Sequence, residues 1–287
     1  MAQQRGVGGD AREPTAQLGR GRAVLVRAVA VLGLLTFSFM LVFVANDAAG
    51  RVGQQEQLVP AGSREAQMGA DRPGEAVHIT GAVAAILIGA SGLAGLIVRP
   101  RRAGSATQTV GASVAMLLTV GIVGDPDNYG GQASPVDLAF VVMAVPPLAA
   151  GVLAAPWRAW RPVALRRPRL LLLAALASPG LWYGFDQGMM QRNTWPPLAD
   201  PHHQAHWYAM SVLAFLIVVV VAGAALAGRG WRVAAASAGA GASALALASL
   251  LSPASASALH PLWAIGAALW GLAVLVATWD GARRSRS

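Results

Sequence analysis

The sequence has 287 residues, of which 55% are hydrophobic and only 12% are charged, and its net charge is +9. Soluble domains carry about 25% charged residues, so this chain has too little charge for an ordinary soluble fold. It contains no cysteine, which excludes disulfides, thiolate nucleophiles and cysteine-based zinc or iron–sulfur sites. The phosphate-binding loop, the nucleophile elbow, the His-Glu-x-x-His motif and the dinucleotide fingerprint are also absent from the sequence.

The hydrophobic residues form eight blocks of about 16–23, the length that a helix needs to cross a hydrocarbon layer about 30 Å thick. We therefore predict an all-α integral membrane protein, a bundle of about eight transmembrane helices. The polar residues 1–22 predict a disordered cytoplasmic tail, and residues 280–287 a short basic tail. The first block is too long for the apolar core of a signal peptide, so we expect it to remain as a membrane helix. The predicted spans are residues 23–45, 76–98, 106–123, 136–155, 170–185, 207–227, 233–251 and 262–279.

The arginines determine the predicted orientation, because positive residues collect on the cytoplasmic side of membrane proteins. With the N-terminus inside, eighteen of the 22 basic residues, all of them arginines, are cytoplasmic, whereas ten of the 13 acidic residues are outside. Both termini are then cytoplasmic. Since topology accounts for the basic charge, we expect the lipid bilayer and not nucleic acid as the partner. The abundance of alanine, glycine and arginine without lysine is typical of a GC-rich bacterial genome, which predicts a bacterial plasma (inner) membrane.

Two of the predicted spans are rich in small residues. The second contains Gly89, Gly92 and Gly95, and the seventh, nearly all alanine, glycine and serine, contains Gly239 and Gly241. Small residues let helix backbones approach closely where lipid supplies no hydrophobic drive. We therefore expect these two helices inside the bundle.

All five histidines lie on the predicted outer side, and three of them, His202, His203 and His206, are clustered. Asp200 is a good N-cap and Pro201 suits the first helical position, so a helix that begins there places His202 and His206 one turn apart. Two imidazoles at this spacing can bind one metal ion. The alternative is a solvated segment that binds no metal.

Two other positions are candidates for the same chemistry. Glu75 and His78, three residues apart near the start of the second span, either belong to a ligand site or serve the helix dipole and the membrane interface. His260 precedes Pro261 at the start of the eighth span, where it either ligates a metal or haem or marks the helix boundary.

Prolines interrupt two predicted spans, Pro146-Pro147 in the fourth and Pro179-Gly180 in the fifth, and predict kinks there. Asp186 follows the second of these pairs. An acidic residue at the end of a broken helix is a recurring feature of ion and proton sites. The pattern favours, as an alternative function, a proton- or ion-coupled transporter that uses Asp186.

Splitting the chain after the fourth span gives two halves of four spans, with a histidine near the start of the second, sixth and eighth. This layout resembles the haem A synthase family, whose haem-ligating histidines lie on even-numbered helices, and Glu75-Ala76-Val77-His78 looks like its Glu-x-x-His motif. Asp137 stands near the start of the fourth span, which lacks the family's histidine, and the cysteine pair of many members is missing. The resemblance implies at most a haem held in the second half, between a histidine of the sixth span, such as His206, and His260.

The leading hypothesis is a multi-pass membrane protein with a histidine-rich transition-metal or haem site at its extracytoplasmic face. It would act in redox chemistry, cofactor maturation or metal handling. The alternatives are the ion-coupled transporter and a non-catalytic assembly or scaffold protein, which is favoured by the lack of ionisable residues deep inside the spans.

Overall fold

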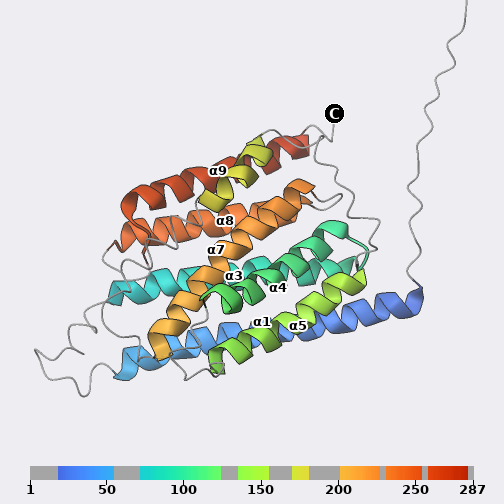
Figure 1. Cartoon of the computed structure of the whole chain (residues 1–287), viewed down its shortest axis with the longest axis horizontal. Coiled ribbons are helices and arrows are strands. Elements are labelled where there is room, and N and C mark those ends of the chain that lie inside the picture. Colours follow the sequence, from blue (N-terminus) through green and yellow to red (C-terminus); the bar gives the residue numbers. More distant parts are fainter. Residues whose placement is uncertain are drawn as a thin grey trace, which may run out of the picture.

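The computed structural model describes residues 19–54, 72–123, 135–154, 170–180, 201–226, 231–253 and 258–283, and every regular element within them is a helix. One helix lies in each of the eight apolar segments. The helices are α1 Arg20–Gln54, α3 Arg72–Val98, α4 Ala103–Val123, α5 Pro135–Ala154, the helix Leu170–Gly180 (yellow in Figure 1), α7 Pro201–Leu226, α8 Trp231–Leu251 and α9 Pro261–Arg283.

Four of the described helices contain segments that are long and apolar enough to cross a membrane. These segments are Arg20–Phe39 in α1, Ile79–Val98 in α3, Trp231–Leu251 in α8 and Pro261–Trp279 in α9. The described residues thus confirm the all-α prediction and agree with a helical membrane protein. The crossing of a membrane by all eight helices stays a prediction.

Four helices form the centre of the bundle and two pairs flank them (Figure 1). In the centre, α3 and α4 pack against each other and against α7 and α8, and α7 packs against α8. On one side α1 and α5 cover α3 and α4. On the other side α9 covers α8. There Trp270 Nε1 of α9 donates a 2.8 Å hydrogen bond to the carbonyl of Ala174 in the helix Leu170–Gly180.

The same helix contacts recur in the two halves of the chain. The pairs α3–α4, α4–α5 and α1–α5 of the first half correspond to α7–α8, α8–α9 and the contact between the helix Leu170–Gly180 and α9 in the second. Two further pairs, α4–α7 and α3–α8, join the halves. They are equivalent to each other when α3 is matched with α7 and α4 with α8. The two halves thus share these helix contacts, and their relation as two four-helix halves stays a prediction.

Small residues set the distance between the central helices. A Cβ added to Gly241 of α8 would lie 2.9 Å from Ile88 Cδ1 of α3, and one added to Gly92 of α3 would lie 2.9 Å from Thr109 Oγ1 of α4. In the apolar segments of α3 and α8, 56% and 50% of the residues are buried, against 22% in α1 and 33% in α9. The prediction that the glycine-rich second and seventh spans lie inside the bundle is confirmed.

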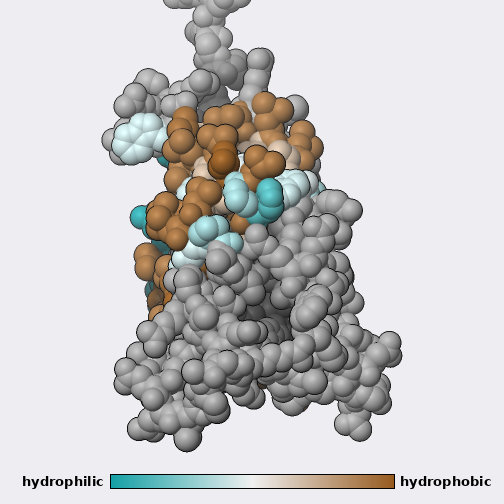
Figure 2. Space-filling view, turned by 90° about the vertical axis from the view of Figure 1, so that its left-hand side faces the viewer, coloured by the Kyte–Doolittle hydropathy of each residue, from teal (hydrophilic) through white to brown (hydrophobic). Residues whose placement is uncertain are grey.

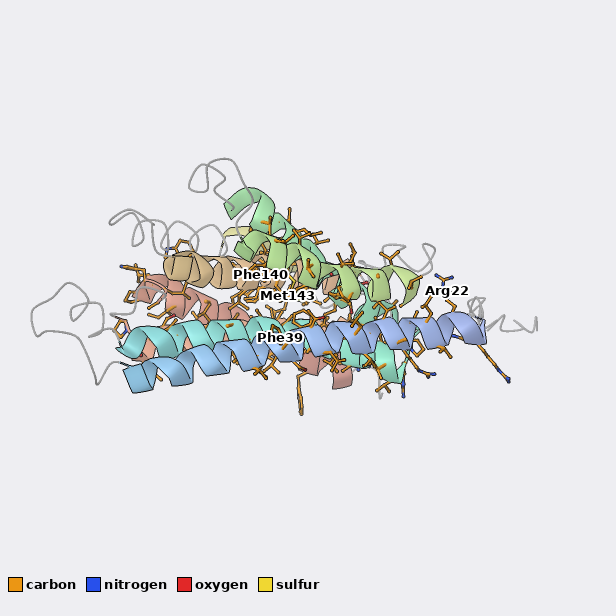
Figure 3. All side chains as sticks on the ribbon, turned by 90° about the horizontal axis from the view of Figure 1, so that it is seen from below. Arg22, Phe39, Phe140 and Met143 are labelled. Atoms are coloured by element: carbon orange, nitrogen blue, oxygen red, sulfur yellow. The ribbon has the colours of Figure 1, made fainter. Side chains whose placement is uncertain are left out.

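The outside of the bundle is apolar along the peripheral helices. On α9, large exposed side chains recur at intervals of three and four residues and form one stripe, made by Leu262, Ile265, Leu269, Leu272, Val276 and Trp279. Phe39, midway along α1, is 70% exposed (Figure 3). Viewed from the end that lies at the left of Figure 1, the described surface over α8 and α9 is mostly hydrophobic (Figure 2). Large apolar surfaces of this kind are rare in soluble monomers but are solvated well by lipid chains.

Both pairs predicted to kink a helix, Pro146-Pro147 and Pro179-Gly180, lie within described helices. Pro146 and Pro147 lie inside α5, which stays one helix from Pro135 to Ala154. The backbone of α1 approaches this point, because a Cβ on Gly33 would lie 3.4 Å from the Pro147 nitrogen. Pro179 and Gly180 are the last described residues of the helix Leu170–Gly180, and the rest of the fifth predicted span, 181–185, lies outside the described residues.

The close contact of α8 with α9 gives a test of the packing. A Cβ on Gly239 would lie 2.9 Å from the backbone oxygen of Gly271, which cannot rotate away. We expect Gly239→Ala to lower the free energy of unfolding by about 1–3 kcal/mol, as overpacking typically does, in a denaturant titration in detergent micelles. Gly21→Ala is the matched control, because a Cβ at Gly21 of α1 meets nothing within 4 Å. Equal stability of the two variants would contradict the contact.

Candidate functional site

Helix α7 begins at Pro201, as the Asp200-Pro201 pair predicts. Its backbone therefore places His202 and His206 one turn apart, with His203 on a neighbouring face. The side chains of these histidines lie outside the described part of the structure, so metal ligation by them stays a prediction.

Glu75 and His78 lie in the first two turns of α3, the helix that corresponds to α7 in the other half of the chain. Helices α3 and α7 contact each other, and both begin at the left-hand end of the bundle in Figure 1. Along α3, His78 precedes Arg99 by 21 residues, which is about 32 Å at 1.5 Å per residue and close to the thickness of a hydrocarbon layer. Two central helices thus bring their histidine-bearing ends to the end of the bundle opposite the Arg99 turn.

His260 has a different position. It is exposed and directly precedes Pro261, the first residue of α9, and its carbonyl accepts a 2.9 Å hydrogen bond from the N–H of Ala264. This is the backbone geometry of an N-cap residue, and ligation by the His260 side chain stays a prediction. Helix α8 contacts both α7 and α9, and Figure 1 shows the beginnings of α7 and α9 at opposite edges of the bundle. The arrangement does not favour a haem shared by His206 and His260.

Among the residues that the structure describes, no three histidine, cysteine, aspartate or glutamate residues are grouped as metal ligands. Asp186, the predicted ion site, lies outside them. The side chains of Glu75 and His78 lie outside them as well. The metal site and the ion site therefore both stay predictions.

Sequence reasoning missed a polar contact in the centre of the bundle, made by Gln108 of α4. This side chain is 2% exposed, and its Nε2 lies 2.6 Å from the Ile88 carbonyl oxygen, 2.7 Å from Ser91 Oγ and 3.1 Å from Ser237 Oγ. Ile88 and Ser91 belong to α3 and Ser237 to α8, so Gln108 joins three of the four central helices. The signal in the sequence is a single side-chain amide inside an apolar span, because a polar group among apolar residues requires a hydrogen-bond partner.

The Gln108 contact has the character of a structural link. The hydroxyls of Ser91 and Ser237 donate to carbonyls of their own helices, Ile88 at 3.0 Å and Ala234 at 2.9 Å, and so present acceptor oxygens to the amide. None of these groups changes its charge near neutral pH. The contact therefore fixes the relative position of α3, α4 and α8 but supplies no general acid or base.

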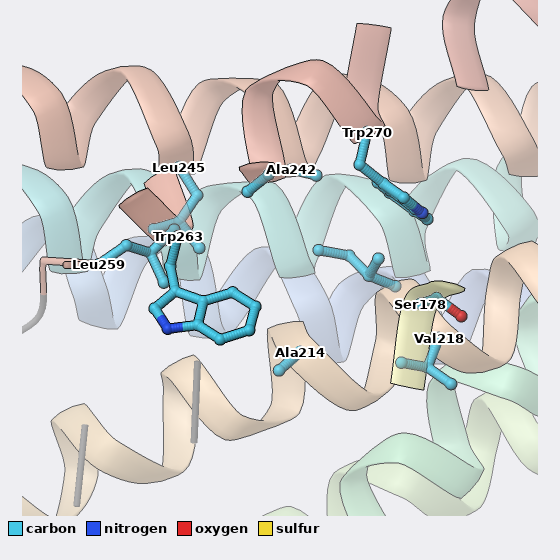
Figure 4. Close-up of a pocket in the computed structure, with 10 residues that line it drawn as sticks. Ser178, Ala214, Val218, Ala242, Leu245, Leu259, Trp263 and Trp270 are labelled. Carbon is cyan, nitrogen blue, oxygen red and sulfur yellow. The ribbon is translucent and has the colours of Figure 1, made fainter. Parts of the chain in front are cut away.

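A void of about 40 Å³ lies between the helix Leu170–Gly180 and helices α7, α8 and α9 (Figure 4). Trp263 and Trp270 line it from α9, and Ser178 lines it from the helix Leu170–Gly180. The hydroxyl of Ser178 donates to the Ala175 carbonyl at 2.8 Å, and the indole N–H of Trp270 is bonded to the Ala174 carbonyl. The other lining residues are apolar. The void is therefore an apolar space. The Ser178 hydroxyl and the Trp270 indole N–H that line it already donate to backbone carbonyls.

No known protein family, no curated protein and no solved structure matches this chain. The likeness to the haem A synthases thus concerns the layout of helices and histidines alone, and it does not show membership of that family.

The Gln108 contact predicts a graded response to substitution. We expect Gln108→Leu to lower the free energy of unfolding by about 0.6–2 kcal/mol, the range for polar contacts between membrane helices. Gln108→Glu should lower it further, because a buried carboxylate would face the acceptor oxygens that now receive the amide. Thr109→Val is the control, since the Thr109 hydroxyl donates only to the Ser105 carbonyl of its own helix at 2.7 Å. Denaturant titration in micelles measures all three, and a Gln108→Leu variant as stable as the unmodified protein would show that the contact is dispensable.

Proposed function

We propose that this chain is a bacterial inner-membrane protein of eight spanning helices that binds a transition-metal ion or haem at its extracytoplasmic end. His202 and His206 of α7 are the ligands, His203 is an additional candidate, and Glu75 and His78 of α3 complete or support the site. Its role is then metal handling, cofactor maturation or redox chemistry. His260 is left out of the site, because α9 is peripheral.

The observation that carries this proposal is the start of α7 at Pro201. An ordered helix from this residue onward gives His202 and His206 the i, i+4 spacing with which one helix offers two imidazoles to a metal. The contact between α3 and α7, together with their corresponding places in the two halves, supports a site to which both helices contribute.

The proposed orientation puts both termini in the cytoplasm. It is supported by the arginine distribution, and by the directions of the helices, since α1 begins and α9 ends toward the right-hand side of the bundle in Figure 1. Eight crossings also return the chain to the side from which it started.

Metal or haem content tests the proposed site. We expect the purified protein to carry stoichiometric metal or a haem absorbance band, and the double variant His202→Ala/His206→Ala to lose it, because both of the proposed α7 ligands are then missing. Elemental analysis together with an ultraviolet–visible spectrum of the detergent-purified protein gives the readout. His260→Ala is the matched control and should keep its full content. If the double variant retains as much metal or haem as the control, the site is not at α7.

The lack of cysteine makes the orientation directly testable, because a single introduced cysteine is the only thiol. Ser63→Cys, between the first two spans, should react with a membrane-impermeant maleimide in intact spheroplasts. Ser285→Cys, near the C-terminus, should react only after the membrane is opened. Labelling of Ser285→Cys in intact spheroplasts would contradict a cytoplasmic C-terminus and with it the even number of crossings.

The second candidate function is ion-coupled transport through Asp186. Its support in the described residues is the pair of prolines inside α5, since each proline leaves one helical carbonyl without its usual N–H partner. If the protein is purified with its native lipids and contains neither metal nor haem, that result would favour the transporter hypothesis or the scaffold hypothesis over the metal site.

A further inference from the structure

Arginines gather at the end of the bundle opposite the histidines, and two of them are held by helix ends. On α1, Arg27 Nε donates a 3.1 Å hydrogen bond to the carbonyl of Ile97, in the last turn of α3. Arg22 Nε donates a 2.9 Å hydrogen bond to the carbonyl of Leu153, in the last turn of α5. Carbonyls in the last turn of a helix have no partner within it, so these bonds satisfy them and fix the two guanidinium groups. Figure 3 shows Arg22 near the beginning of α1.

The turn between α3 and α4 adds three more arginines next to Arg27. It contains Arg99, Arg101 and Arg102, and it is closed by a 3.0 Å hydrogen bond from the Arg102 N–H to the Arg99 carbonyl. Arg99 follows Ile97, the contact of Arg27, by two residues. The sequence has no acidic residue between positions 14 and 46 or between 76 and 124, so neither segment supplies a carboxylate to Arg27 or Arg99.

The same turn begins a helix without a side-chain cap. The Arg102 carbonyl accepts the 3.1 Å hydrogen bond of the Ala106 N–H, which makes Arg102 the N-cap residue of α4. A guanidinium group has only donors and cannot accept from the N–H groups of the first turn. A helix start of this kind favours an anion, through its dipole and through its N–H groups.

The depth of the cluster identifies the anion. The bond from Arg27 to the Ile97 carbonyl brings the Arg27 guanidinium to the end of the apolar segment Ile79–Val98 of α3. Arg99 directly follows that segment and lies about 32 Å from His78 along the helix. This length matches a hydrocarbon layer about 30 Å thick, so both guanidinium groups lie at the depth of lipid phosphates. A guanidinium fork binds the two free oxygens of a phosphate in pairs, which a lysine does not.

We infer that Arg27, Arg99 and the beginning of α4 form a binding site for the phosphate headgroup of an anionic phospholipid. Arg27 donates to the Ile97 carbonyl through Nε, which leaves the N–H groups of its two terminal nitrogens for a phosphate. Arg102 adds positive charge. The site differs from general attraction of a basic surface to lipid, because it depends on the guanidinium shape and not on charge alone.

Native mass spectrometry of the full chain, titrated in neutral detergent with phosphatidylglycerol or phosphatidylcholine, tests this site. We expect phosphatidylglycerol to be preferred and the double variant Arg27→Lys/Arg99→Lys to bind it about tenfold more weakly, since charge is kept but paired hydrogen bonds are lost. Arg283→Lys, at the end of α9, is the control and should bind as the unmodified protein does. Arg99→Lys alone should lower the affinity in part while leaving both carbonyl contacts of α1 intact, so a loss there is not an effect of misfolding.

Two outcomes would overturn the site. Lysine variants that keep the full preference for phosphatidylglycerol would reduce the cluster to general surface charge. Displacement of the lipid by millimolar inorganic phosphate would assign the guanidinium groups to a free anion instead of a phospholipid.

Discussion

Helices in a hydrocarbon layer gain no hydrophobic free energy by contacting each other, because lipid chains are as apolar as leucine side chains. What remains is close packing and the satisfaction of polar atoms. The contact of α8 with α9 shows the first of these in its extreme form, since a Cβ on Gly271 would lie 2.6 Å from the backbone oxygen of Gly239, and one on Gly239 2.9 Å from that of Gly271. The two backbones touch where glycine faces glycine. Between α4 and α5 the same role falls to Gly151, whose added Cβ would lie 3.0 Å from the Ala106 carbonyl oxygen.

The second requirement explains where chemistry is found in this molecule. In the middle of the bundle the polar side chains hold helices together. Gln108 joins α4 to α3 and α8, and Trp270 of α9 is bonded to the Ala174 carbonyl of the helix Leu170–Gly180. Buried hydroxyls such as those of Thr109 and Ser113 donate to carbonyls four residues earlier in their own helix. Groups that change charge or bind ions are thereby displaced toward the two ends of the helices. One end receives arginines that satisfy carbonyls, and the other receives the histidines.

The positions of the helices could be predicted from the sequence, because the length of an apolar block translates directly into a crossing, and Asp200-Pro201 gave the start of α7. The interior positions of α3 and α8 followed from their small residues. The partners of each helix could not be predicted, since in an apolar solvent Leu269 on the exposed stripe and Leu245 in the core have the same chemistry. The contacts of Gln108 with Ser91 and Ser237, and of Arg27 with Ile97, depend on those partners and were missed for that reason. The sequence also could not tell that His260 stands on a helix at the edge of the bundle, whereas His78 and His206 stand on central helices.

The helix contacts distinguish the histidines on central helices from the one on a peripheral helix. In the predicted division α3 corresponds to α7 and α5 to α9, and α3 and α7 are central helices whereas α5 and α9 flank the centre. A site between α3 and α7 would therefore receive residues from both halves. The two contributions differ, because α3 brings Glu75 and His78 three residues apart whereas α7 brings His202 and His206 four apart. A carboxylate beside imidazoles suits an ion such as zinc or iron and not the soft copper(I) ion, which prefers sulfur ligands. Halves that share one packing scheme but differ in these residues can hold one asymmetric metal site in place of two identical ones.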